Sequence, residues 1–108
     1  MNIEVIPSQA RRLSIKENNV ETGHAYIYII QNGLHAKPYA LLEDVFVEET
    51  HRSKGLGTQL VKAAIEEAKK LHCTKIIGTS RYSRPSVHEW YTKLGFEDYG
   101  KEFRMNLQ

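Results

Sequence analysis

The chain has 108 residues, of which 41% are hydrophobic and 26% charged, and its formal net charge at pH 7 is +2. This length suits one domain with one core, and the composition excludes the disordered and fibrous classes. So small a charge also argues against a dedicated nucleic-acid-binding protein, which needs a concentrated surplus of Lys and Arg. We therefore expect residues 1–108 to form a single domain with no nucleic-acid partner.

Cysteine content and apolar runs bear on the cellular compartment. Cys73 is the only cysteine, so no intramolecular disulfide can form and a disulfide-stapled extracellular scaffold is excluded. We interpret it as a small apolar residue rather than a nucleophile. Residues 1–7 lack the basic and apolar regions of a signal peptide, and no apolar run is long enough to cross a bilayer. The expectation is a cytoplasmic protein without a membrane partner.

The first half of the chain predicts an antiparallel meander. Polar and apolar residues alternate from Arg11 to Glu17, which predicts a half-buried strand. Asn18 and Asn19 predict a turn, and the aromatic and β-branched residues from Ala25 to Ile30 predict a second strand. A third β-prone run covers residues 39–47.

The pattern then changes to helical spacing. Apolar residues recur from Leu56 to Leu71 every three or four positions, with charged residues on the other side. Residues 74–79 predict a short strand. Because strand, helix and strand follow in succession, the crossover should be right-handed and should make the third and fourth strands parallel.

A second helix and a last strand complete the expected elements. Pro85 suits the first position of a helix, and Gly95 ends it. We interpret residues 96–105, with Gly100 in the middle, as a bent strand or loose hairpin. The predicted fold class is α/β (α+β), with a mixed, mostly antiparallel twisted sheet and one parallel strand pair joined by a helix.

The connection over residues 48–58 has features of an anion site. It follows a strand and opens a helix, where unpaired N–H groups and the positive end of the helix dipole favour an anion. Gly55 and Gly57 let the backbone approach that anion closely, while Arg52 and Lys54 add positive charge. These residues leave two interpretations open, namely a pyrophosphate site and a turn that needs glycine only for its backbone.

Two familiar phosphate motifs do not fit this connection. A Walker loop requires Lys before its Ser or Thr, whereas Thr58 follows Gly57 directly. A Rossmann fingerprint requires a third glycine at position 60, where Leu60 stands. Both are disfavoured.

Two motifs together resemble the GNAT superfamily of N-acetyltransferases. Arg52-Ser53-Lys54-Gly55-Leu56-Gly57, after a strand ending in Val47, is similar to its Arg/Gln-x-x-Gly-x-Gly/Ala signature. The segment from His88 to Phe96 is similar to its late aromatic-Tyr-x-Lys-Leu-Gly-Phe segment. The likeness runs from about His24 to Leu107, and the strand and helix pair that usually precede it are not matched. The resemblance therefore implies a short form with a reduced N-terminal region.

The resemblance implies acetyl-CoA as the co-substrate. The backbone of Phe46 and Val47 would pair with the pantetheine arm, and N–H groups from Ser53 to Thr58 would hold the pyrophosphate. The third and fourth strands would splay apart at a bulge in the earlier one. The cofactor-binding residues implied are Val45, Phe46, Val47, Arg52, Ser53, Lys54, Gly55, Leu56, Gly57, Thr58, Arg84 and Tyr91.

Arg84 departs from the family pattern. Many members carry Asn at this position, where it contacts the cofactor or the substrate. An Arg there meets a CoA phosphate or an acidic substrate, or it is a solvated surface residue.

The implied reaction assigns further roles. Amine acetylation requires a neutral nucleophile, a donor for the oxyanion and a proton for the thiolate. Tyr91 matches the family's general acid, with a core aromatic as its alternative. Glu43 lies where some members place a base acting through water, unless it pairs with a Lys or Arg, and Asp44 should point to the other face. His24 and Tyr26 share a strand face and suggest an acceptor pocket.

The predicted function is direct transfer of acetyl from acetyl-CoA to a primary amine in a ternary complex, with Glu43 or solvent as base, Tyr91 as acid, and the N–H of Val45 or Phe46 as oxyanion donor. The acceptor is a small molecule or a peptide or lysine side chain, and a second subunit of a homodimer is one way to complete the pocket. The five histidines lack metal-binding spacing, so no metal is expected. The alternative is a non-catalytic CoA-binding or regulatory module of the same fold.

Overall fold

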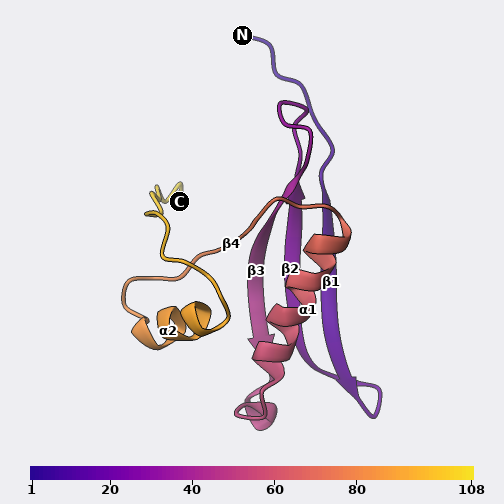
Figure 1. The fold of residues 1–108 in the computed structure, drawn as a ribbon, viewed down its shortest axis with the longest axis vertical. Coiled ribbons are helices and arrows are strands. Elements are labelled where there is room, and N and C mark those ends of the chain that lie inside the picture. Colours follow the sequence, from indigo (N-terminus) through magenta and orange to yellow (C-terminus); the bar gives the residue numbers. More distant parts are fainter. The chain divides into compact units, whose positions relative to one another are not determined.

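The computed structural model describes residues 1–108, which divide into two compact units, 1–78 and 79–108. Figure 1 shows the first unit with its sheet and long helix, and the second unit with a single short helix. The elements in chain order are β1 (Gln9–Glu17), β2 (Val20–Ile30), β3 (Tyr39–Val47), a 3-10 turn η1 (Glu49–His51), α1 (Leu56–Lys70), β4 (Ile76–Gly78) and α2 (Pro85–Lys93). No helix is long and apolar enough to cross a membrane.

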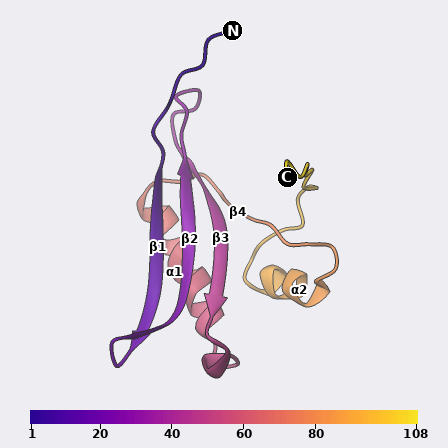
Figure 2. The same cartoon turned by 180° about the vertical axis from the view of Figure 1, so that it is seen from behind.

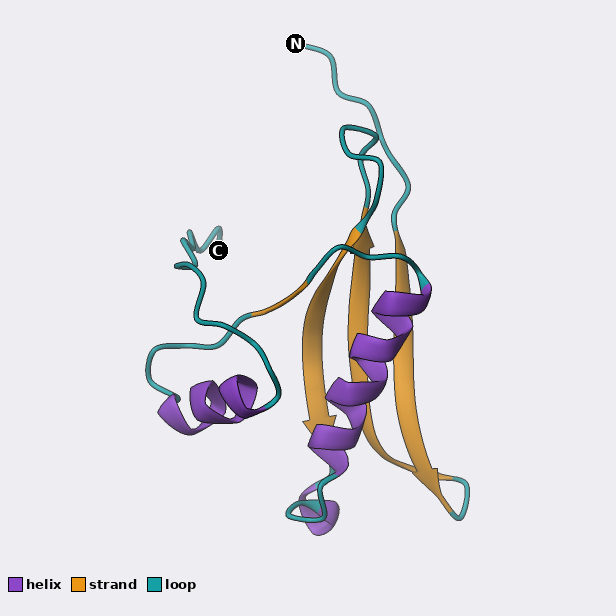
Figure 3. Cartoon of the chain, in the orientation of Figure 1, coloured by secondary structure: helices purple, strands orange, loops and turns teal.

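The sheet has the predicted mixed topology. Its strand order is β1-β2-β3-β4, with β1–β2 and β2–β3 antiparallel and β3–β4 parallel. Asn18 and Asn19 at the β1–β2 turn have φ values of 51° and 65°, a conformation that Asn tolerates better than most residues. Helix α1 joins the two parallel strands, as Figure 3 shows. The α+β fold class is confirmed.

Helix α1 packs on one face of the sheet and creates the core. Alternate residues of β2 meet the helix, and small side chains among them let the two layers approach closely. Figure 2 shows the opposite face, which no helix of the first unit covers. The fully or nearly buried apolar residues are Ala25, Ile27, Ile29, Ala40, Leu42, Leu60, Val61, Ala64 and Ala68. The intervening side chains of β2 are therefore presented on the open face.

Replacing Ile27 tests whether this layer carries the stability of the first unit. Ile27 is 0% exposed, so Ile27→Ala should lower the free energy of unfolding by about 2–5 kcal/mol through lost contacts and the cavity left behind. Val20→Ala, at a residue of the same strand that is 65% exposed, should change it by less than about 0.5 kcal/mol. Urea unfolding measures both values, and equal effects would contradict this placement of the core.

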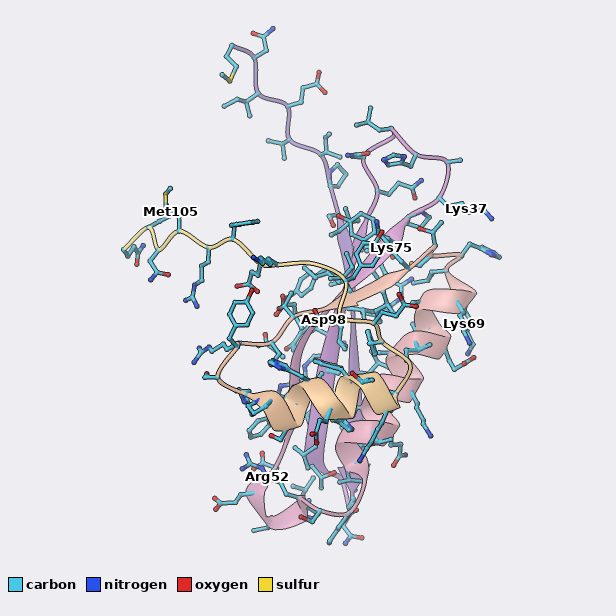
Figure 4. The ribbon with its side chains drawn as sticks, turned by 60° about the vertical axis from the view of Figure 1, so that its left-hand side comes forward. Lys37, Arg52, Lys69, Lys75, Asp98 and Met105 are labelled. Atoms are coloured by element: carbon cyan, nitrogen blue, oxygen red, sulfur yellow. The ribbon has the colours of Figure 1, made fainter.

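The second unit contains α2 and an irregular C-terminal segment. The expected helix from Pro85 is confirmed, and Pro85 lies in its first turn. The expected strand or hairpin over residues 96–105 is wrong, because residues 96–108 adopt no regular secondary structure. A strand needs a neighbour for its N–H and C=O groups, and this unit contains no strand. Figure 4 labels Met105 on this segment, and this residue is 81% exposed.

Candidate functional site

Strand β3 contains the bulge implied by the resemblance. Tyr26 pairs with Glu43 and His24 pairs with Phe46, so two residues of β3, at positions 44 and 45, face one residue of β2. Asp44 has a φ of 51°, in the left-handed region that few residues other than glycine adopt. A non-glycine residue held in this conformation marks the bulge as a candidate functional position.

Pairing between the parallel strands stops just before the bulge. Residues 40–42 of β3 pair with residues 76–78 of β4, and no pair follows Leu42. The outer edge of β3 from Glu43 to Val47 is thus free of β4. An extended ligand arm of the kind implied for Phe46 and Val47 could add to such an edge through main-chain hydrogen bonds.

An open hollow of about 470 Å³ lies beside the bulge. Its lining comes from β2 and β3, on the helix-free face, and consists of His24, Tyr26, Asp44, Val45 and Phe46. The His24 ring lies 5.7 Å from that of Tyr26 and 5.4 Å from that of Phe46, measured between centroids. The structure thus brings the two expected acceptor-pocket residues together with two of the expected cofactor-binding residues.

The bulge affects the argument from which the position of Asp44 was expected. Simple alternation along β3 predicts that Asp44 points away from the face of Glu43. Asp44 is among the residues that line the hollow, and the extra residue of the bulge interrupts the alternation, so alternation no longer determines its face. Glu43, paired with Tyr26, is half-buried and belongs to the same face as Tyr26. Two carboxylates therefore lie near the hollow, where the sequence predicted one.

A salt-bridge network on the same face holds Tyr26 and Glu21. The two terminal nitrogens of Arg12 donate to the Glu21 carboxylate at 2.6 and 2.8 Å, and its Nε donates to the Tyr26 hydroxyl at 2.9 Å. Hydrogen bonding to Arg12 lowers the pKa of Glu21 to about 2, so this carboxylate stays ionised at working pH. The sequence analysis missed Arg12 and Glu21. Only the strand register, with its irregularity between Ile15 and Lys16, brings these two residues together.

The loop before α1 has the backbone of an anion site. Ser53 and Gly55 have φ values of 67° and 78°, two left-handed residues within three positions. Gly55 is the N-cap of α1, and no side chain caps this helix end. Residues 53–55 are exposed, so an anion can reach the loop. The N-terminal N–H groups of a helix, here without a capping side chain, form a suitable anion site.

Arg52 and His51 fasten this loop to the sheet. The Arg52 Nε donates to the carbonyl of Val47 at 3.0 Å, and its guanidinium lies 5.8 Å from the centre of the Phe46 ring. His51 Nε2 lies 3.3 Å from a carboxylate oxygen of Glu17 in the β1–β2 hairpin. Figure 4 shows Arg52 at the end of the unit where β3 leads into α1. Sequence reasoning treated Arg52 as a charge for the anion, whereas its guanidinium here braces the end of β3.

The C-terminal cap of helix α2 accounts for the glycine and the aromatic residues of the segment from His88 to Phe96. The N–H of Gly95 donates to Thr92 O at 3.1 Å and the N–H of Phe96 to Tyr91 O at 3.0 Å, with Gly95 at a φ of 103°. This is a Schellman motif, which favours glycine at this position and an apolar contact across the cap. The rings of Tyr91 and Phe96 make that contact at 5.1 Å, and Trp90 stacks on Tyr91 at 5.3 Å. The half-buried Tyr91 ring is thus held on two sides.

The predicted residues are divided between the two units. Glu43, residues 45–47 and residues 52–58 belong to the first, whereas Arg84 and Tyr91 belong to the second. Arg84 is the exposed N-cap of α2. Burial raises the pKa of the Cys73 thiol, which argues against a nucleophile at that residue. No group of three His, Cys, Asp or Glu residues is placed to hold a metal ion.

Comparison with known proteins gives consistent matches. Residues 4–96 match the model of the acetyltransferase (GNAT) family. The chain is 30% identical over 70 residues to aminoglycoside N(6')-acetyltransferase type 1 of Acinetobacter haemolyticus, covering 65% of this chain and 48% of that protein. It thus spans about half the length of the curated relatives it matches.

Solved structures show the same fold. A protein of Agrobacterium tumefaciens str. C58, proposed to be an acetyltransferase, is 30% identical with a TM-score of 0.83, over 90% of this chain and 68% of that chain. The aminoglycoside N-acetyltransferase AAC(6')-Iy in complex with CoA has a TM-score of 0.74 over 90% of this chain and 75% of that chain. At 21% identity, this second likeness concerns the fold alone.

Proposed function

This chain belongs to the acetyltransferase (GNAT) family, and we propose from this premise that residues 1–108 form one N-acetyltransferase domain that acetylates a primary amine with acetyl-CoA. The observation that carries the proposal is the juxtaposition of a bulged strand edge, free of β4 beyond Leu42, with an uncapped helix start four residues after a 3-10 turn. The first feature suits an extended amide arm, and the second suits a diphosphate.

The proposed binding of acetyl-CoA uses main-chain groups almost throughout. Phe46 and Val47 pair with the pantetheine arm along the free edge of β3, and the N–H groups of residues 53–58 hold the pyrophosphate. Lys54 adds positive charge at the exposed loop. Arg52 keeps the loop against the end of β3, since its Nε is already engaged by Val47 O. Arg84 contributes a second cation from the N-terminus of α2.

The proposed chemistry is direct attack of the amine on the thioester in a ternary complex. Glu43 or solvent removes a proton from the acceptor ammonium, which makes nitrogen a nucleophile. The N–H of Val45 or Phe46 then stabilises the oxyanion that develops as the C–N bond forms. Tyr91 protonates the departing thiolate and regains a proton from the nitrogen, so the net products are amide, free thiol and one proton.

The acceptor is an open choice between a small-molecule amine and a lysine side chain. The name of the Acinetobacter haemolyticus relative favours a small polyamine sugar among these, although the chain spans only part of that protein. The hollow is wide open and offers aromatic rings and Asp44 to a cationic amine. A second subunit can complete its wall.

Product formation separates this proposal from a non-catalytic CoA-binding module. The purified chain is incubated with acetyl-CoA and, in separate reactions, an aminoglycoside, glucosamine 6-phosphate and a lysine peptide. Thiol release is followed with a chromogenic disulfide, with the single cysteine as a fixed background, and the amide is identified by mass. The proposal predicts stoichiometric thiol and amide with at least one acceptor. Binding of acetyl-CoA without any amide would favour the non-catalytic module.

A further inference from the structure

We infer that His24 takes up the proton that leaves the acceptor ammonium, through water in the hollow at the β3 bulge. This inference rests on the proposed function and specifies the solvent route left open there. His24 lies directly opposite Phe46 in the β2–β3 ladder, and both side chains line the hollow. The imidazole is therefore beside the main-chain segment that is proposed to stabilise the oxyanion.

The hydrogen bonding of His24 fixes which nitrogen can accept. Its Nδ1 lies 3.4 Å from Oε2 of Glu21. Because the Glu21 carboxylate is ionised, with a pKa of about 2, it can only accept, so the proton of a neutral imidazole belongs on Nδ1. The lone pair is then on Nε2. A carboxylate that accepts from one ring nitrogen and so orients the imidazole often accompanies a histidine that exchanges protons.

Arg12 in turn holds Glu21. Its two nitrogens bind both carboxylate oxygens, and its Nε binds the hydroxyl of Tyr26, whose ring lies edge-on to His24. Arg12 and Glu21 are thus positioning residues that keep the imidazole in place. Sequence reasoning named His24 as a pocket residue but gave it no proton role, because this chain of contacts depends on the strand register.

Charged residues from neighbouring strands surround His24. The charged and titratable groups at neighbouring positions are Arg12 and Lys16 from β1, Glu21 and Tyr26 from β2, and Glu43 and Asp44 from β3, with Arg52 over the adjoining Phe46 ring. The Glu21 carboxylate that pairs with Arg12 also lies 3.4 Å from His24 Nδ1, so it can balance the charge of an imidazolium formed during turnover. An imidazole and a carboxylate can both accept the ammonium proton, so replacing His24 and Glu43 separately distinguishes the two.

The proton balance closes without an additional reagent. The ammonium gives one proton, through water, to Nε2 of His24, and the neutral nitrogen attacks the thioester carbon. The C–N bond forms and the C–S bond breaks. The nitrogen loses its second excess proton to Tyr91, which has protonated the thiolate. The His24 imidazolium then releases its proton to solvent, which accounts for the one proton of the net reaction.

The test compares the pH dependence of kcat/KM in the wild type, His24→Gln, Glu43→Gln and the control His35→Gln, between about pH 5.5 and pH 9. His35 lies in the exposed β2–β3 loop, outside the site. The wild type, Glu43→Gln and His35→Gln should lose activity toward the acid end of this range. His24→Gln should lose this acid limb, with kcat/KM at least about tenfold lower at neutral pH. Thermal midpoints establish that each variant is folded.

If folded His24→Gln keeps the acid limb of the kcat/KM profile, the inference is overturned. Loss of that limb in Glu43→Gln instead would also overturn it. Acetyl transfer itself is still observed in both cases. Absence of transfer by the wild type is a different result, since it removes the proposed function and the inference with it. A readout independent of activity is the ¹⁵N spectrum of the imidazole in the resting protein. The Nδ1–H tautomer of His24 supports the inference, and the Nε2–H tautomer contradicts it.

Discussion

Tyr91→Phe should lower kcat by about 100-fold or more while leaving the fold intact. The ring of Tyr91 is held by Trp90 at 5.3 Å and by Phe96 at 5.1 Å, and a phenylalanine ring can make the same contacts. Only the phenolic hydroxyl is removed. If that hydroxyl protonates the leaving thiolate, its loss costs the contribution of a general acid, typically 100-fold to 10,000-fold.

The matched control for this variant is Tyr82→Phe. Tyr82 belongs to the same unit and is 80% exposed, so the loss of its hydroxyl should leave kcat unchanged. Steady-state thiol release measures kcat and KM for both variants, and thermal unfolding reports on the fold. A Tyr91→Phe protein with the kcat of the wild type would remove Tyr91 from the proposed mechanism.

Gly55→Val should weaken acetyl-CoA binding by about tenfold or more. Gly55 has a φ of 78°, and no atom lies within 4 Å of a Cβ added there, so backbone strain is the only direct effect. A residue other than glycine pays about 1–2 kcal/mol in this conformation, more when β-branched. Relaxation of that strain turns the N–H groups at the start of α1, and a loss of 1.4 kcal/mol in binding is a factor of ten.

Gly33→Val is the control that introduces a similar backbone strain outside the loop before α1. Gly33 lies in the β2–β3 loop with a φ of 85° and equally open surroundings. The same substitution there carries a similar conformational cost, but it is outside the proposed cofactor site. Calorimetric titration with acetyl-CoA should therefore give a wild-type Kd for Gly33→Val and a raised Kd for Gly55→Val. Equal Kd values for the two variants would contradict the role of the loop.

The long periodic elements could be predicted from sequence because their patterns are local. The bounds predicted for β3 match the structure, and α1 ends at Lys70, one residue before the expected Leu71. Gly55 and Gly95 lie at helix ends and have positive φ values. Glycine adopts this conformation readily, so the residue type alone points to these helix ends. Strand β4 is shorter than expected, because only residues 76–78 pair with β3.

The site could be predicted only in part, because its remaining features depend on the register between strands. The anion-binding role of residues 52–58 was predicted from a contiguous motif, and the backbone of this loop suits that role. The face of Asp44 could not be predicted from alternation, because a bulge is not visible in the alternation of side chains. Arg12 and Glu21 are nine positions apart, and nothing in their local sequence indicates that they meet. The prediction of a strand or hairpin over residues 96–105 was wrong, because β-prone residue types do not ensure that a neighbouring strand is available for pairing.

The central claim is that main-chain amides at the start of α1 hold a diphosphate. The most direct measurement is the ¹H–¹⁵N spectrum of the labelled chain, titrated with acetyl-CoA and, separately, with S-acetylpantetheine, which lacks the pyrophosphate. If the loop holds the diphosphate, amides of residues 53–58 shift strongly with acetyl-CoA and little with S-acetylpantetheine, while those of residues 45–47 shift with both. Saturation with acetyl-CoA that leaves the amides of residues 53–58 unshifted would show that this loop does not hold the diphosphate.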